Sequence, residues 1–121
     1  MIEPRIDKPA NQLRICFSGR VDVQETRRWR GKLQELLSEL QPGFKLVTDL
    51  TELASMDPEC AGEIRGFMDL CNAKGVSLIV RVIPDPHKDI GFNILSLFHY
   101  RHGQRIVTCE TLAEAERILQ T

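Results

Sequence analysis

The 121-residue sequence lacks the segments that would attach it to a membrane or to nucleic acid. No apolar run approaches the ~18–20 residues that a membrane-spanning helix needs. The first twelve residues, MIEPRIDKPANQ, contain no apolar signal-peptide core. The formal net charge is -1, from 16 basic and 17 acidic residues, which argues against a general nucleic-acid binder and against polybasic membrane attachment. We therefore expect a cytoplasmic protein with no inserted membrane segment.

The motifs of several enzyme classes are missing as well. The chain contains neither GxxxxGKS/T nor GxGxxG, the glycine-rich loops that bind phosphates, and it has no GxSxG nucleophile elbow. A zinc site typically needs three or four protein ligands. The chain has three histidines, His87, His99 and His102, and no further metal ligand accompanies them at useful spacing. Asp22, Asp49 and Asp57 follow or end predicted strands, where carboxylates can bind a cation, although helix capping accounts for two of them. We therefore expect a protein that has no catalytic activity and binds neither a metal ion nor a cofactor.

Few features indicate thiol chemistry. The four cysteines form no CxxC pair, and in a chain without an export signal buried free thiols are the usual outcome: Cys16, Cys60, Cys71 and Cys109. Cys60 and Cys71 are on nearly the same face of a predicted helix but three turns apart, too far for a disulfide. One alternative stays open, because Cys60 at a helix N-terminus, where a thiolate is favoured, would suit a redox sensor.

Hydrophobic patterns predict strands and helices in alternation. Strands are expected over residues 12–18, 44–50, 76–83 and 105–108, and helices from Asp22, from Asp57, over 88–100 and from Thr111. This order is typical of an α/β fold, with a mostly parallel sheet of four to five strands covered by about four helices. We expect one domain over residues 1–121, in which residues 1–11 are poorly defined or add an edge strand.

Capping residues mark the expected helix starts. Asp22 can accept a hydrogen bond from a first-turn amide, and Glu25 completes a capping box. At the next start Asp57 is a natural N-cap, and Pro58 suits the first helical position because it has no amide hydrogen to leave unpaired. A basic cluster in the first of these helices is expected to be solvated, without a partner: Arg27, Arg28 and Arg30.

Three segments of the chain resemble a STAS domain, the module found in anti-sigma factor antagonists and at the C-termini of sulfate transporters. FSGRVDV (Phe17–Val23) resembles the family's first strand-to-helix junction, and TCETLAEAERIL (Thr108–Leu119) resembles its closing strand and helix. DLTELASMDPECAG (Asp49–Gly62) aligns without gaps to a family pattern close to DLSxVxFMDSSGL. The resemblance implies a STAS-like fold and a non-catalytic signalling module that acts in bacterial transcription regulation.

The chain departs from the family at the regulatory position. In the family's switchable members an aspartate precedes two serines, and a partner kinase phosphorylates the second. Here the aspartate is Asp57, the serine positions hold Pro58 and Glu59, and Cys60 replaces the glycine that follows. No hydroxyl is present from Asp57 through Gly62, so the resemblance implies a module that is not switched by phosphorylation at this site.

Two interpretations of Glu59 stay open. A helix N-terminus has unpaired amides and a partial positive charge, which stabilise a nearby anion by about 0.3–1 kcal/mol. Glu59 therefore either only stabilises its own helix or imitates the phosphorylated state. The imitation is partial, because a carboxylate carries one negative charge where a phosphate carries about -1.5 to -2.

The resemblance implies a partner-binding surface around the start of the second helix: Asp22, Asp57, Pro58, Glu59, Cys60, Gly62 and Arg65. Arg65 and Asp69 are four residues apart and either extend this surface or form an intrahelical ion pair. The expected partner is an anti-sigma factor or kinase, a larger signalling assembly or a membrane transport complex, and a homodimer is compatible with the resemblance. The alternative function is binding of a nucleotide or another small ligand, which requires a pocket.

Overall fold

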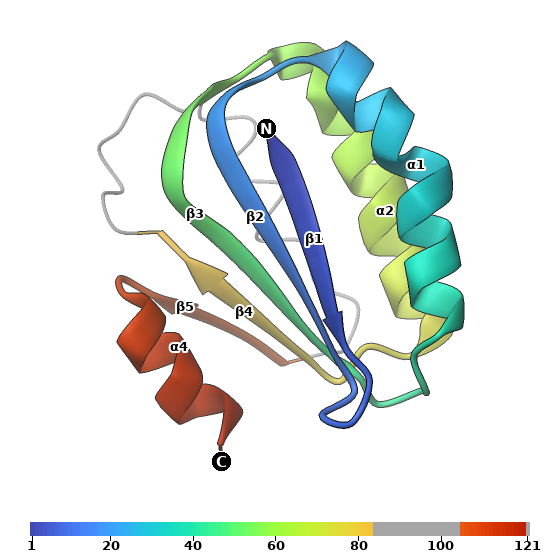
Figure 1. Ribbon diagram of the computed structural model, residues 1–121, viewed down its shortest axis with the longest axis vertical. Coiled ribbons are helices and arrows are strands. Elements are labelled where there is room, and N and C mark those ends of the chain that lie inside the picture. Colours follow the sequence, from blue (N-terminus) through green and yellow to red (C-terminus); the bar gives the residue numbers. More distant parts are fainter. Residues whose placement is uncertain (84–104, 121) are drawn as a thin grey trace.

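A computed structural model describes residues 1–83 and 105–120 of the chain, and within these ranges the chain forms one five-stranded sheet with helices on both faces (Figure 1). The strands are β1 (Ile2–Asp7), β2 (Gln12–Val21), β3 (Lys45–Met56), β4 (Leu78–Val82) and β5 (Arg105–Cys109). The helices are α1 (Val23–Ser38), the short 3-10 helix η1 (Pro58–Cys60), α2 (Ala61–Lys74) and α4 (Leu112–Leu119).

The strands lie in sequence order, β1-β2-β3-β4-β5, with β1 antiparallel to β2 and the other neighbours parallel. The expected α/β fold with a mostly parallel sheet is confirmed. The described residues contain three α-helices where about four were expected, because the helix predicted over 88–100 lies outside the described residues. The N-terminal segment pairs as an edge strand, from Ile2 opposite Phe17 to Asp7 opposite Gln12.

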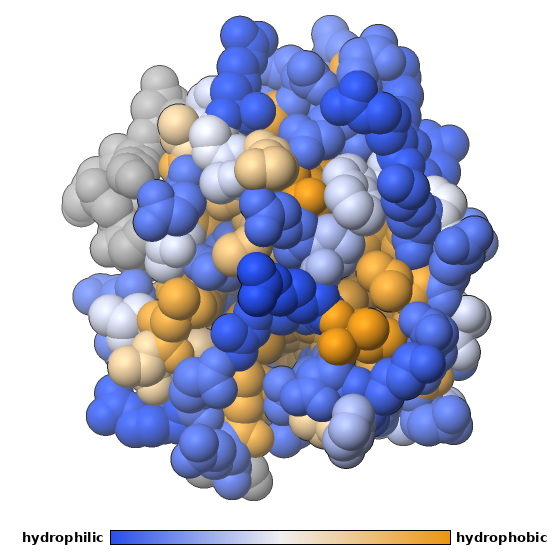
Figure 2. All heavy atoms as spheres, in the orientation of Figure 1, coloured by the Kyte–Doolittle hydropathy of each residue, from blue (hydrophilic) through white to orange (hydrophobic). Residues whose placement is uncertain are grey.

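Two apolar clusters, one on each face of the sheet, form the core. The larger lies between the sheet and the pair α1 and α2, and it includes Leu13, Ile15 and Phe17, which alternate along β2 as their spacing predicts. The smaller lies beneath α4. All five residues of β4 are buried, as expected for a central parallel strand covered on both faces. The surface seen in Figure 2 is mostly hydrophilic, and apolar atoms reach it between β1 and α1.

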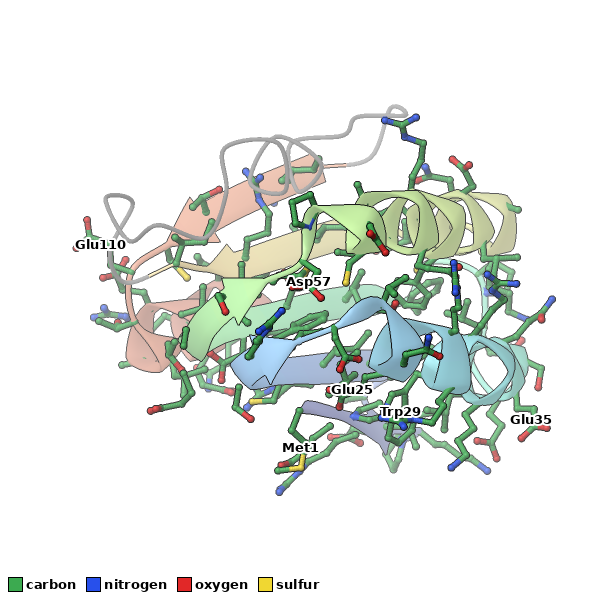
Figure 3. All side chains as sticks on the ribbon, turned by 90° about the horizontal axis from the view of Figure 1, so that it is seen from above. Met1, Glu25, Trp29, Glu35, Asp57 and Glu110 are labelled. Atoms are coloured by element: carbon green, nitrogen blue, oxygen red, sulfur yellow. The ribbon has the colours of Figure 1, made fainter. Side chains whose placement is uncertain are left out.

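The start of α1 shows how tertiary contacts change a local motif. The Asp22 Oδ1 atom accepts a hydrogen bond from the Glu25 amide at 2.9 Å, so the predicted cap is confirmed. Glu25 does not complete a capping box, because its carboxylate accepts a hydrogen bond from the Ile2 amide at 2.6 Å and lies 3.5 Å from the Met1 ammonium. Figure 3 shows Met1 and Glu25 side by side. The edge strand therefore replaces the second half of the motif.

Candidate functional site

The junction between β3 and α2 is the region where the sequence predicts a partner-binding surface. The chain leaves β3 in an extended conformation at Asp57, turns through η1 and enters α2 at Ala61. The expected helix start at Pro58 is thus a single 3-10 turn, closed by a 2.9 Å hydrogen bond from the Cys60 amide to the Asp57 carbonyl. Proline fits the first position of this turn, because an amide hydrogen there would have no partner within the helix and proline has none.

The expectation that Asp57 caps the helix is wrong for its side chain. Asp57 occupies the N-cap position but makes no side-chain capping hydrogen bond. Its Oδ1 atom instead accepts a hydrogen bond from Arg20 Nη2 at 3.0 Å. Pairing of Arg20 with Ser55 and of Val21 with Met56 brings the ends of β2 and β3 together. The neighbouring strand thus supplies a cationic partner that competes with the amides of η1.

Glu59 lies in the first turn of this junction with an exposed side chain. Within residues 1–83 and 105–120, its carboxylate forms no ion pair and no hydrogen bond. Four other predicted surface residues are exposed as well: Asp22, Pro58, Gly62 and Arg65. The start of α2 therefore presents an unpaired carboxylate to solvent beside the partial positive charge of the helix N-terminus.

Cys60 differs from the other predicted surface residues because its side chain is fully buried, at 0% exposure. Its Sγ atom lies 3.8 Å from the Val21 carbonyl oxygen, beneath the turn. Burial raises the pKa of the Cys60 thiol, and the nearby carboxylate of Asp57 raises it further. A buried, protonated thiol is a poor nucleophile. Cys60 therefore supports the turn from below and cannot contact a partner directly.

The environments of the other three cysteines also indicate that their thiols pack in the fold and do not react. All four cysteines are free, as expected. Burial raises the pKa of Cys71 to about 12 and contributes most to raising the pKa of Cys16 to about 11, with its hydrogen bond to Asp49 adding to the shift. Burial also raises the pKa of the Cys109 thiol. These environments disfavour the redox-sensor alternative.

Two of the clustered arginines on α1 have a partner that the sequence did not reveal. Glu63, in the first turn of α2, accepts hydrogen bonds from Arg30, one of them from Nε at 2.9 Å, and lies 3.7 Å from Arg27 Nε. Arg27 and Arg30 are exposed, as expected, but they are not only solvated, because the packing of α1 against α2 brings a carboxylate 33 residues away from Arg30 into reach. Arg65 and Asp69 are both exposed, and among the described residues no ion pair joins them.

Neither a metal-binding group nor a bilayer-spanning helix occurs in the described part of the chain. Within residues 1–83 and 105–120, no three His, Cys, Asp or Glu side chains group closely enough to hold a metal ion. The three histidines lie outside these ranges. None of the described helices combines the length and the apolar character that crossing a bilayer demands.

A cavity of about 310 Å³ lies between the sheet, α1 and α2. Its floor is formed by β1, β2 and β3, and α1 and α2 form its walls. Most of the lining side chains are apolar, and the polar ones are few: Thr26, Arg30, Gln34, Thr48 and Glu63. The structure therefore contains the pocket that the small-ligand alternative requires.

Neither the protein-family models nor the curated proteins include a match to this chain. Solved structures do match it. SpoIIAA, an anti-sigma factor antagonist, matches in its unphosphorylated form with a TM-score of 0.70 and 16% identity over 99% of this chain and 98% of SpoIIAA. The chain has the STAS fold.

Two further structures agree with this fold. Bacillus SpoIIAA in its phosphorylated form matches with a TM-score of 0.65 and 15% identity over 98% of this chain and 99% of that one. A candidate anti-sigma factor antagonist from Thermotoga maritima matches with a TM-score of 0.66 and 17% identity over 100% of this chain and 96% of that one. The STAS fold that the three sequence segments predicted is therefore confirmed across nearly the whole chain.

Proposed function

We propose that this STAS-fold chain is a non-catalytic signalling module that binds a protein partner through the start of α2 and is not switched by phosphorylation there. The docking surface comprises Asp22, Asp57, Pro58, Glu59, Gly62 and Arg65. The observation that carries the proposal is the exposed Glu59 carboxylate, which has no partner among the described residues. Unlike Asp22 and Asp57, this side chain is free to meet a partner.

The comparison with SpoIIAA supports the regulatory part of the proposal. SpoIIAA has been solved in a phosphorylated and an unphosphorylated form. In the family pattern the phosphorylated serine corresponds to Glu59, and the preceding serine corresponds to Pro58. A carboxylate at this position carries a permanent negative charge, whereas a serine is charged only after phosphorylation. A module of this kind docks constitutively, in one charge state.

The chemistry of the surface also limits the partner. An exposed carboxylate beside the polar start of a helix favours a partner with a cationic or amide-rich patch. An anti-sigma factor or its kinase is the first candidate, and a larger signalling assembly or a transport complex at a bacterial membrane is the alternative. A cytoplasmic protein can reach each of these partners.

The test compares charge reversal at Glu59 with the same change at a distant exposed glutamate. Glu59→Lys is expected to abolish capture of the partner from an extract of the native cell, because it places a cation in the docking surface. Glu35→Lys is the control, since Figure 3 shows Glu35 at the far end of α1 from Asp57. Both variants are expected to keep the wild-type circular dichroism spectrum.

Capture is measured by mass spectrometry after affinity purification with each variant. A protein retained by wild type and Glu35→Lys but lost from Glu59→Lys supports the docking surface. Identical sets of captured proteins for all three would remove the start of α2 from consideration.

No observation favours a nucleotide as the physiological ligand. The cavity has few polar lining groups, and the chain has no glycine-rich phosphate loop. Phosphates in a largely apolar cavity would lose solvation without enough hydrogen-bond donors to replace it.

A further inference from the structure

Two glycines border the cavity between α1 and α2. Gly62 and Gly66 are one turn apart on α2 and both line the cavity. Both glycines are exposed, and a Cβ atom added at either residue would meet no atom within 4 Å, so the space beside them is open. Close-packed interiors contain few voids larger than a water molecule. A cavity of about 310 Å³ is at the lower end of the usual range for ligand pockets.

The floor and walls of the cavity are suited to an apolar molecule. Ile15 and Phe17 on β2 contribute to the floor, and Trp29 on α1 and Phe67 on α2 contribute to the walls. Burial of apolar ligand surface against such side chains is favourable by about 25 cal/mol per Å². The lining therefore selects a ligand with a large hydrocarbon part.

Thr48 provides a hydrogen-bonding group in this apolar floor. Its side chain is 3% exposed, and its Oγ1 atom has no hydrogen-bond partner among the described residues. A buried hydroxyl without a partner is destabilising, and native proteins rarely leave such groups unpaired. A ligand with one oxygen atom at the floor would supply the missing partner.

The charges beside the cavity are largely neutralised. Arg30 and Glu63 both line the cavity and are hydrogen bonded to each other from opposite helices. A charged ligand group would have to compete with this pair, whereas a neutral ligand leaves it intact. The pairing therefore favours an uncharged ligand.

We propose that this cavity binds a small neutral molecule, mostly hydrocarbon, with one hydrogen-bonding oxygen. One water molecule, with its single non-hydrogen atom, takes up about 30 Å³ in the liquid. On this scale a cavity of about 310 Å³ holds a ligand of roughly ten non-hydrogen atoms. A medium-chain alcohol or ketone has this size and chemistry. Ligand binding here does not rest on the proposed docking function, although Gly62 borders both the cavity and the docking surface. The variants that test it change only residues outside the docking surface.

The probe is 1-octanol, titrated into the full chain, and the reporter is Trp29, the chain's single tryptophan and a wall of the cavity. We expect a saturable change in tryptophan fluorescence at octanol concentrations below about 1 mM, a range that small ligands reach in well-formed apolar pockets. Octanoate, its charged counterpart, is expected to bind at least tenfold more weakly. Equal or tighter binding of octanoate would contradict the neutral ligand class, and no saturable octanol signal would overturn the site.

Two matched glycine variants test the location of the site. Gly66→Leu places a side chain in the open space at the edge of the cavity and is expected to weaken octanol binding at least tenfold. Gly31→Leu makes the same change on α1 at a glycine that has open space around it but does not line the cavity. It is expected to bind octanol like wild type. Both changes raise helix propensity, so both variants are expected to fold. Equal octanol affinity in the two variants would place binding elsewhere.

Thr48→Val tests the polar group. The substitution keeps the shape of the side chain and removes the hydroxyl, so octanol binding is expected to weaken about two- to tenfold, the loss of one hydrogen bond. The same variant is expected to have a higher denaturation midpoint than wild type, because an unpaired buried hydroxyl is removed. Unchanged octanol affinity in this variant would overturn the assignment of the ligand oxygen to Thr48.

Discussion

The two strand-to-helix junctions on the α1/α2 face of the sheet both carry an aspartate at the N-cap, and the two aspartates act differently. Asp22 caps α1 through a 2.9 Å hydrogen bond to the Glu25 amide. Asp57 makes no capping bond and instead pairs with Arg20 at 3.0 Å. Of these two aspartates, the one that does not cap its helix is the one whose carboxylate is engaged by an arginine from the neighbouring strand. This difference leaves the start of α2 open to outside contacts.

The same difference explains the roles of the two glutamates. Glu25 is occupied by the backbone amide of Ile2 and by the Met1 ammonium, so the start of α1 is satisfied within the chain. Glu59 has no such contacts within the described residues. The two junctions differ because β1 lies against the first one, whereas the second lies farther along the sheet. The proposed docking function belongs to the second junction for this reason.

The largest expected effect on stability comes from removing the Asp22 side chain, which caps α1. Asp22→Ala is expected to lower the free energy of unfolding by about 1 kcal/mol, within a range of ~0.5–2 kcal/mol, because the Glu25 amide loses its partner. Urea denaturation followed by circular dichroism measures this change, and Asp22→Asn, which retains a capping oxygen, is the control. A loss as large in Asp22→Asn as in Asp22→Ala would show that the cap is not the cause.

A smaller effect is expected at Glu59. Glu59→Gln removes the charge with little change of shape and is expected to lower the free energy of unfolding by about 0.3–1 kcal/mol through the dipole of α2. If Glu59 imitates a phosphorylated state, partner affinity also falls in Glu59→Gln and stays unchanged in Glu35→Gln. Denaturation and a binding titration with the captured partner separate the two interpretations. Partner affinity equal to wild type in Glu59→Gln would leave Glu59 with a helix-stabilising role alone.

The smallest effect is expected for the pair that diverts Asp57 from capping. A double-mutant cycle with Arg20→Ala and Asp57→Ala is expected to give a coupling energy of about 0.2–0.5 kcal/mol, since the Arg20 side chain is 72% exposed and water screens the pair. The coupling is expected to decrease further in 1 M salt. A coupling above about 1 kcal/mol would make this junction as tightly held as that of α1.

Short-range patterns were enough to predict much of the fold. The alternation along β2, the continuous apolar run of β4 and the Asp22 cap all depend on residues a few positions apart, and all are present in the structure. Gly75 ends α2 in a left-handed conformation with φ of 97°, which glycine adopts more readily than other residues. The resemblance of three segments to STAS domains predicted the order of these elements.

The candidate site was predicted less completely, because several of its contacts join distant parts of the chain. The Arg20–Asp57 pair spans 37 residues and the Arg30–Glu63 pair spans 33. Cys60 was predicted both as a buried thiol and as part of the partner-binding surface, and the structure bears out only its burial. Its Sγ atom lies beside the Val21 carbonyl oxygen, which comes from another strand. The sign in the sequence of an ion-pair partner for Arg27 and Arg30 was the carboxylate of Glu63, in the first turn of the next helix.

The chain's local pattern was thus sufficient for most strands and helices of the described residues, for their order and for the unphosphorylatable residue at position 59. Periodicity, caps and residue identity involve only near neighbours in sequence. The tertiary structure decided which aspartate caps, which of the two junction glutamates finds a partner within the described residues, and where a cavity lies between α1 and α2. Those outcomes depend on which atoms from distant segments compete for the same partner or the same space. Such competition exists only after the chain has folded.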